Sequence, residues 1–367
     1  MSENFAAGQK AIPEAHSVRL LAIGPMPPPL HGQTLVMDHM VSQLAPVFPG
    51  MRTLAEVNTK RWLRPVVAIR QAFSIRDCDV VYIAVKASQG MWITTGLALL
   101  ARSVGARVFL HHHSYLYVRE RKKRMVALTR AAGPSAYHIV LSHSMASELT
   151  STMPEITRTL VVGNAAMIEQ SLADLPLKND AAELVLGHMS DLSDAKGIGE
   201  VVDLAVKLKE AGIRTRLILG GAAPRGEDRR HLDRAERELG EQFDYRGILA
   251  GESKIDFYRD INHFVLPSRD EAVPLVLYEA LAAGAVCVAT RVGSVPEQLE
   301  RSPAVLAQSA DTFVEEVLPI LSSWSVTEET SRGCRQAYLD ALSESQEQLQ
   351  LLVRLLAGNS DGRPRGS

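Results

Sequence analysis

The first half of the chain alternates short apolar runs with segments of helical periodicity. The apolar runs are rich in β-branched residues and end at Gly, Pro or polar residues, which is the pattern of buried strands. The expected strands are 18–24, 79–85, 107–111 and 138–142, and the expected helices are 32–44, 91–103 and 119–132. Strands that alternate with helices favour a parallel sheet covered by helices on both faces.

The second half of the chain repeats this alternation. The expected strands are 184–188, 216–220, 243–247, 261–266 and 286–290, and the expected helices are 197–211, 225–239 and 274–283. The polar stretch 169–182 is the best linker candidate between the two series. The expected fold class is therefore α/β, with two Rossmann-like, doubly wound domains facing across a cleft, where ligands bind at the carboxyl ends of strands.

Charge also divides the chain. Residues 1–165 hold 18 Lys and Arg against 9 Asp and Glu, and the remainder holds 22 against 33, which together give the net charge of −2. A basic half and an acidic half favour two folding units with different partners. We expect an N-terminal domain over 1–168, a C-terminal domain over 183–342, and a C-terminal helix with a flexible tail over 343–367.

Composition excludes several classes of protein. Hydrophobic residues make up 46% of the chain and charged residues 22%, which is typical of a globular protein. The three cysteines lie far apart in sequence and form neither a disulfide framework nor a metal-ligand cluster. The N-terminus lacks a secretory signal pattern, and the most apolar stretch, 90–101, is too short to span a bilayer. We expect a cytoplasmic location.

The segment 267–284 carries the strongest chemical signal. A helix is expected to open near Pro274, so that Glu271 lies before it and Glu279 in its second turn. The amides of Leu275 and Val276 then lie at a helix N-terminus, which suits a diphosphate, while the carboxylates can accept hydrogen bonds from hydroxyls. An acidic pair near a helix start, taken alone, more often caps and solvates a surface helix.

The whole stretch resembles the donor-site signature of the retaining family 4 glycosyltransferases, which have the GT-B fold. That signature has two glutamates with seven residues between them, after a Pro-Ser turn and before a helix of small residues that ends in Gly. The matching positions are Pro267, Ser268, Glu271, Pro274, Glu279, Ala280 and Gly284, followed by Gly293 and Glu297. The resemblance implies that Glu271 holds the sugar and Glu279 the ribose of a nucleotide diphosphate sugar. No visible motif requires a metal or other cofactor.

The resemblance continues through the second half of the chain. Lys196 before Gly197 is similar to the family's Lys-Gly motif, which implies that Lys196 contacts the donor phosphates. Gly221 and Tyr245 lie where the family's next two strands end, and the loop after Tyr245 is expected near the nucleotide base.

One position departs from the family's pattern. Asp191 stands where the family usually has an arginine that helps to neutralise the diphosphate. Arg246 and Lys254 are the candidates that could replace its charge.

The loop 27–34 is similar to the family's first strand–loop–helix. The resemblance implies that the Gly32 backbone approaches the donor phosphates, although His31 replaces one glycine of the family's usual pair. The loop is not a GxGxxG sequence, which weighs against a dinucleotide site. Asn164 resembles the asparagine that ends the N-terminal domain in this family.

Three adjacent histidines follow the strand expected at 107–111. Alternation places His111 and His113 on one side and His112 on the other. A metal site lacks support, because no carboxylate or cysteine accompanies them at ligand spacing, and a structural role is the default for any one of them. The resemblance implies a histidine near the anomeric carbon and the acceptor. His113 is the first candidate for this catalytic role, with His111 and Tyr115 also on the acceptor side.

The basic run 119–124 opens the helix expected at 119–132. Such a run is most often a solvated face, but it can also contact anionic lipid or an acceptor diphosphate, at about 1 kcal/mol for each basic residue near a charged surface. Nucleic acid is disfavoured, because the run lacks interleaved aromatic residues or a reader motif.

The function that these patterns predict is transfer of a hexose from a nucleotide diphosphate sugar to a hydroxyl of a glycan or lipid-linked acceptor, with retention of configuration, in polysaccharide biosynthesis. Lys196, the Gly32 backbone and the helix start near Leu275 would stabilise the departing diphosphate. Two alternatives stay open. One is a GT-B epimerase or hydrolase of nucleotide sugars, and the other is a non-catalytic GT-B partner subunit, which Asp191 and His31 make conceivable.

Overall fold

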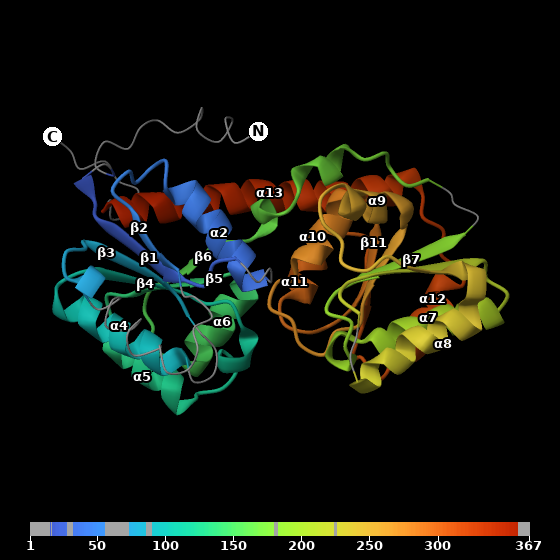
Figure 1. Ribbon diagram of the computed structural model, residues 1–367, viewed down its shortest axis with the longest axis horizontal. Helices are drawn as coiled ribbons and strands as arrows, with labels where there is room; N and C mark the ends of the chain where they lie inside the picture. Colours follow the sequence, from blue (N-terminus) through green and yellow to red (C-terminus); the bar gives the residue numbers. More distant parts are fainter. Residues whose placement is uncertain are drawn as a thin grey trace. The chain divides into compact units, whose positions relative to one another are not determined.

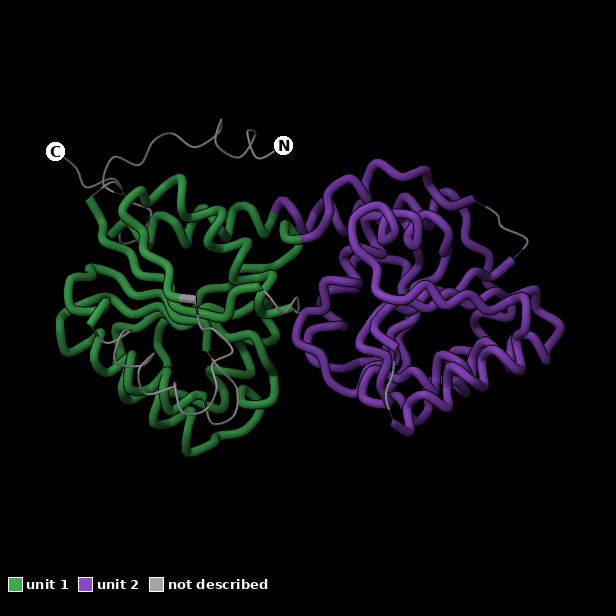
Figure 2. Tube along the Cα trace, in the orientation of Figure 1, with its two compact units in different colours: residues 1–167, 344–367 green, residues 168–343 purple. Residues whose placement is uncertain are grey.

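The protein is represented by a computed structural model, which describes residues 15, 17–27, 32–55, 73–85, 90–179, 183–223 and 226–358 (Figure 1). The chain divides into two compact units. The first comprises Met1–Met167 with Glu344–Ser367, and the second comprises Ile168–Ser343 (Figure 2). Within the described ranges, none of the helices combines the length and the apolar character needed to cross a membrane.

The first unit contains a sheet of six strands in the order β2-β1-β3-β4-β5-β6. Every neighbouring pair is parallel, as the alternating pattern predicted. The strands are β1 (Leu20–Gly24), β2 (Arg52–Ala55), β3 (Val80–Ala84), β4 (Arg107–His111), β5 (Tyr137–Val140) and β6 (Thr159–Val161). Because all of them run the same way, their carboxyl ends share one edge of the sheet.

Helices cover both faces of this sheet. They are α2 (Gly32–Leu44), α4 (Met91–Ser103), α5 (Lys123–Ala132), α6 (His143–Thr152) and the end of α13 (Glu328–Ala357). One face packs against α2 and the last turns of α13, in a core that includes Leu20, Tyr82 and Leu352. Figure 1 shows α4, α5 and α6 on the opposite face. Both faces are therefore buried, and consecutive strand residues can all be apolar.

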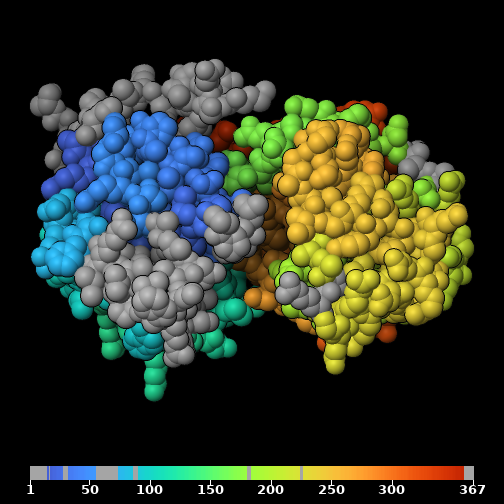
Figure 3. Space-filling model, viewed as in Figure 1, coloured from blue at the N-terminus to red at the C-terminus, as the bar shows by residue number. Residues whose placement is uncertain are grey.

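The second unit has a parallel six-stranded sheet in the order β12-β11-β10-β7-β8-β9. Its strands are β7 (Leu184–Met189), β8 (Thr215–Gly220), β9 (Phe243–Tyr245), β10 (His263–Leu266), β11 (Val286–Thr290) and β12 (Val305–Ala307). Its helices are α7 (Ile198–Glu210), α8 (Arg229–Leu239), α9 (Glu252–Asp260), α10 (Leu275–Ala282), α11 (Val295–Leu299), α12 (Phe313–Leu321) and the start of α13. One face packs against α7, α8 and α12. The space-filling view shows α8 and α9 on the surface of this unit, in yellow to orange (Figure 3).

Two expected helices begin elsewhere than the pattern predicted. The helix expected from residue 119 begins at Lys123, because Arg121 pairs with Glu155 and Lys122 donates to the Leu116 carbonyl, which holds the preceding residues outside the helix. The helix expected from residue 343 begins at Glu328. Its last turns pack in the first unit, so residues 344–358 do not form a separate segment.

Buried histidines make the stability of both units depend on pH. Burial lowers the pKa of His138, His188 and His263 to about 4. As pH falls, the unfolded chain binds protons near the ordinary pKa of 6.5, while the folded chain binds them only near 4. Stability from these groups is therefore complete above pH 6.5 and is lost as pH falls through this window.

We expect each of these histidines to lower the free energy of unfolding by about 1 kcal/mol between pH 7.5 and 5.5. Urea denaturation at the two pH values measures this loss. His188→Gln should reduce the loss, whereas replacement of the exposed His143 by Gln should leave it unchanged. A His188→Gln variant with the full wild-type loss would contradict the assignment.

Candidate functional site

The predicted donor residues gather where the strand order of the second sheet reverses. β7 lies between β10 and β8, and ligands of parallel α/β sheets bind outside the carboxyl ends of strands at such a reversal. The turn after β7 carries Lys196, and the loop after β10 carries Glu271. Lys196 Nζ lies 2.7 Å from Glu271 Oε1, and the Glu271 side chain is only 10% exposed. The fold thus joins two predicted residues that lie far apart in sequence.

Two glycines permit the close backbone contacts of this site. Gly197 has a φ of +77°, and a Cβ there would lie 2.4 Å from the Pro267 carbonyl oxygen. Gly293 has a φ of +54°, and its Cβ would lie 1.8 Å from the Glu271 carbonyl oxygen. Both positions therefore require glycine. They fix the turn that carries Lys196 and the loop that carries Glu271.

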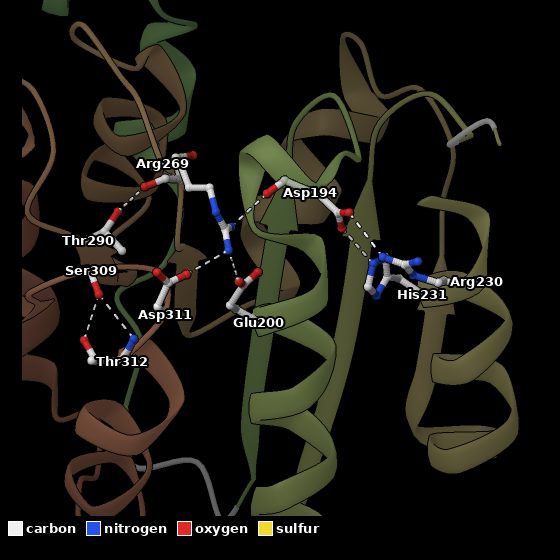
Figure 4. A network of polar contacts seen from close by, with 10 residues as sticks. Asp194, Glu200, Arg230, His231, Arg269, Thr290, Ser309, Asp311 and Thr312 are labelled. Atoms are coloured by element: carbon white, nitrogen blue, oxygen red, sulfur yellow. Dashed lines mark hydrogen bonds and ion pairs between the residues drawn. The ribbon is translucent and has the colours of Figure 1, made fainter. Parts of the chain in front are cut away.

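Arg269 clamps the turn that carries Lys196 (Figure 4). Its backbone N–H donates to the Ala195 carbonyl at 3.0 Å, and its Nη1 donates to the Asp194 carbonyl at 2.9 Å. Its Nη2 reaches Glu200 at 2.7 Å and Asp311 at 3.2 Å. No local pattern in the sequence points to this role, because the carboxylate partners of Arg269 come from separate elements.

The Asp194 side chain is held from the other side of the same turn. His231 Nε2 and Arg230 Nη2, both on α8, lie 2.8 Å and 3.3 Å from its carboxylate oxygens (Figure 4). Arg269 therefore fixes the backbone of the turn from Asp194 to Lys196, and residues of α8 fix the Asp194 side chain.

Glu279 is the second carboxylate of the site. Its side chain is 8% exposed and accepts hydrogen bonds from two residues of α9. Lys254 Nζ lies 2.7 Å from Oε1, and the Tyr258 hydroxyl lies 2.8 Å from Oε2. Burial, reinforced by the Glu279 charge, raises the pKa of Tyr258 well above its ordinary value. Tyr258 therefore keeps its proton and donates a hydrogen bond to Glu279.

The start of α10 lies between the two carboxylates in sequence. Pro274 is the N-cap, and Leu277 N–H donates to the Pro274 carbonyl at 3.2 Å. The amides of Leu275 and Val276 lie in this first turn, where an α-helix offers no internal acceptor for its N–H groups. The partial positive charge of the helix N-terminus is thus close in sequence to both glutamates.

The strands on the other side of β7 supply Gly221 and Arg246. Gly221 follows β8, donates to the Gly247 carbonyl at 2.7 Å, and accepts from the Tyr245 hydroxyl at 3.0 Å. Arg246 follows β9 at the same edge of the sheet, but its guanidinium lies 2.9 Å from Asp244 and 2.5 Å from Asp260.

Of the two cations expected to replace the missing arginine, Lys254 contacts a predicted donor-site carboxylate, whereas Arg246 is paired with two other carboxylates. Asp191 itself is exposed in the stretch that follows β7.

In the first unit, Gly32 and His113 lie near one edge of the sheet. Gly32 opens α2 after β1, and His113 follows β4, while His31 lies outside the described residues. Burial lowers the pKa of His113 to about 4, so its ring is neutral at pH 7. Within the described part of the chain, both of its ring nitrogens lack a hydrogen-bond partner.

The other two acceptor-side candidates are engaged inside the unit. His111 Nδ1 is hydrogen-bonded to the Tyr82 hydroxyl, and burial, with smaller effects from neighbouring histidines, lowers the pKa of His111 well below its ordinary value. Tyr115 is buried, and its hydroxyl lies 3.0 Å from Ser144 Oγ. His112 Nε2 lies 3.0 Å from His138 Nδ1.

Metal binding finds no site in the described residues. Over these ranges, no group of three or more His, Cys, Asp or Glu side chains is placed to hold a metal ion. That the reaction needs no metal or other cofactor stays a prediction.

Known proteins resemble this chain in sequence and in structure. The family model for glycosyl transferases group 1 matches residues 175–337, which include every residue of the second-unit site. A segment of 109 residues is 33% identical to EpsF of Bacillus subtilis (strain 168), which carries the provisional name of a glycosyltransferase. This match spans 29% of the chain and 27% of the length of EpsF.

Several solved structures share the fold across nearly the whole chain. Sucrose-phosphate synthase from Thermosynechococcus elongatus superposes with a TM-score of 0.68 at 16% identity, covering 92% of this chain and 98% of its own. The Anabaena protein Alr3699/HepE, solved with UDP, gives a TM-score of 0.68 at 15% identity, covering 93% and 100%. The lipopolysaccharide outer core galactosyltransferase WaaB gives 0.64 at 15% identity, covering 91% and 99%.

The two parallel six-stranded sheets are thus those of the GT-B fold, as expected from the sequence. The family match over residues 175–337, the similarity to EpsF and the shared fold together support a GT-B glycosyltransferase of group 1.

Proposed function

We propose that this glycosyltransferase moves a hexose from a nucleotide diphosphate sugar to a hydroxyl of a glycan or lipid-linked acceptor, with retention of configuration, in polysaccharide biosynthesis. The observation that carries the proposal is a pair of nearly buried carboxylates, Glu271 before the start of α10 and Glu279 within that helix. Each carboxylate forms an ion pair with one lysine.

Each part of this arrangement suits one part of the donor. Lys196 and the first amides of α10 supply positive charge for the diphosphate, which becomes a leaving group in the reaction. A carboxylate has about four lone-pair positions, so Glu279 keeps room for ribose hydroxyls beside Lys254 and Tyr258. Glu271, which accepts a hydrogen bond from Lys196, would likewise accept hydrogen bonds from hydroxyls of the sugar. Catalysis would then rest mainly on positioning and charge stabilisation.

The first unit would supply the acceptor side. His113 is neutral at pH 7, so its ring can donate one hydrogen bond and accept another. Its ring nitrogens, which have no hydrogen-bond partner among the described residues, suit a hydroxyl of the acceptor or of the transferred sugar. The backbone at Gly32, which opens α2, would lie near the donor phosphates.

Uridine nucleotides are the first donors to test. The neighbour HepE has been solved with UDP and with UDP-glucose, and its fold matches 92–93% of this chain. The shared fold supports the choice of UDP-glucose as a first substrate without fixing the sugar.

We also propose that the basic run contacts an anionic membrane surface. Arg121 and Lys122 are engaged within the protein by Glu155 and by the Leu116 carbonyl. Arg119 and Lys123 have exposed side chains, so their charges can approach lipid phosphates, and the Arg119 guanidinium also lies 4.9 Å from the centroid of the Tyr115 ring.

Replacing Glu279 by Ala should weaken UDP binding by about tenfold or more, because charge-assisted hydrogen bonds to the ribose are lost. Isothermal calorimetry with UDP measures this effect. Glu300→Ala, which removes an exposed carboxylate of the same unit, is the control and should bind like the wild type. Unchanged binding and transfer by Glu279→Ala would contradict the assignment.

The same assays separate the two alternative functions. If the wild-type protein binds neither nucleotide diphosphates nor nucleotide diphosphate sugars, this result would favour a non-catalytic partner subunit. Rapid conversion of UDP-glucose without an acceptor would favour a hydrolase or epimerase, since a transferase should show little turnover under those conditions.

Replacing Arg269 by Ala should slow transfer by several-fold to about tenfold, because the turn that carries Lys196 loses its clamp. The free energy of unfolding should change by less than about 1 kcal/mol, since the Arg269 side chain is 45% exposed and solvent screens its ion pairs. Arg229, which pairs with Asp233 within α8, provides the control variant Arg229→Ala. Equal loss of stability and activity in both variants would point to a general structural effect instead.

Replacing both Arg119 and Lys123 by Gln should lower binding to vesicles that contain phosphatidylglycerol by about tenfold or more, at roughly 1 kcal/mol for each charge. Cosedimentation with such vesicles, and with purely zwitterionic ones, measures the effect. Binding that is the same for the variant and the wild type would remove this run from the membrane contact.

A further inference from the structure

Four cationic side chains come from the elements that carry the candidate donor site, and their partners divide them into two classes. Arg246 and Arg269 each pair with two carboxylates. Lys196 and Lys254 each pair with one carboxylate, and that carboxylate is one of the two predicted to bind donor hydroxyls. The arginine charges are thus neutralised within the protein, whereas each lysine shares its charge with the ligand site.

Lys254 is positioned by its helix. Lys254 and Tyr258 are four residues apart on α9, so they lie on one face of that helix and reach the two oxygens of Glu279 together. The end of the helix is anchored by Lys178, whose Nζ donates to the carbonyls of Tyr258 at 2.8 Å and Arg259 at 2.7 Å. Figure 3 shows α9 on the surface of its unit. Lys254 is accordingly 23% exposed rather than sealed in the core.

The ammonium of Lys254 has unused hydrogen-bonding capacity. A lysine has three N–H donors, and the Lys254 ammonium makes one bond within the described residues, to Glu279. Tyr258 holds the other oxygen of that carboxylate, so Glu279 stays oriented if Lys254 turns part of its charge elsewhere. The compact, flexible charge of a lysine suits this double use better than the rigid fork of an arginine.

We infer that Lys254 is a second phosphate-binding cation, which links the ribose-binding carboxylate Glu279 to the diphosphate of the donor. This inference rests on the proposed function. When ribose hydroxyls donate hydrogen bonds to Glu279, they compete with Lys254 for the carboxylate oxygens. The N–H groups of Lys254 that do not bond to Glu279 can then donate to a phosphate oxygen. Lys196 serves the same diphosphate from the turn after β7, so two lysines on separate elements share its charge.

Ligands with and without phosphate distinguish two roles of Lys254, which are direct contact with phosphate and support of Glu279 alone. Support of Glu279 alone would affect uridine and UDP by the same factor, because both carry the ribose. Contact with phosphate would affect UDP alone. Tyr258→Phe serves as the reference for pure support, since it removes a hydrogen bond to Glu279 without removing charge.

The experiment measures the affinities of UDP and uridine for the wild type, Lys254→Met, Lys254→Arg and Tyr258→Phe. UDP binding is followed by calorimetry and uridine binding by competition with UDP, each at two salt concentrations. ADP with adenosine, and GDP with guanosine, are measured in the same way. Lys207→Met, which removes an exposed lysine of the same unit, controls for loss of net charge.

Lys254→Met should weaken UDP by about tenfold or more while changing uridine little, and should reduce the salt dependence of UDP binding. Lys254→Arg should restore much of the affinity for UDP, and Lys207→Met should bind like the wild type. Equal weakening of UDP and uridine, or unchanged UDP binding in Lys254→Met, would overturn the inference and leave the proposed function standing. A wild-type protein that binds none of the diphosphates would overturn both.

Discussion

The candidate donor site depends on keeping two carboxylates charged in a nearly buried position. An ionised carboxylate removed from water is costly unless it is paired and hydrogen-bonded. Lys196 meets this requirement for Glu271, and Lys254 with Tyr258 meets it for Glu279. The lysines thus hold the Glu271 and Glu279 carboxylates in fixed orientations near the positive end of α10, where they can bind a ligand rich in hydroxyls.

Much of the surrounding structure holds these pairs in place. Arg269 fixes the turn that carries Lys196 by its backbone N–H and by its guanidinium, and Figure 4 shows the guanidinium contacts. Gly197 and Gly293 allow the backbone to approach within distances that a side chain would forbid. Such constraints order the site residues before the donor binds, so that less conformational entropy is lost on binding. Preorganised sites gain affinity and rate in this way.

The sequence predicted the parallel sheets because buried parallel strands appear as continuous β-branched runs. It missed β2, β6 and β12, which are strands of three or four residues at the edges of the sheets, too short to show a pattern. It also placed the start of α13 too late, because the helix begins in one unit and ends in the other, so that its apolar face changes partner along its length.

At the site, a local motif could be recognised but its supports could not. Glu271 and Glu279 stand out because their spacing around a helix start is visible in one short stretch. Tyr258 reads as an ordinary core aromatic until Glu279 is seen beside it. The engagement of Arg246 depends partly on Asp260, which comes from the end of the next helix, and Arg269 draws on Glu200 and Asp311 from distant elements.

The most direct test of this account is hydrogen–deuterium exchange with and without UDP, which reports where a nucleotide diphosphate binds along the chain. Slower exchange should concentrate at the turn 193–197, the stretch 267–279 and helix α9, with Glu279→Ala abolishing the effect at the same UDP concentration. Protection confined to the first unit, or protection of these segments that persists in Glu279→Ala, would contradict the donor site assigned to the second unit.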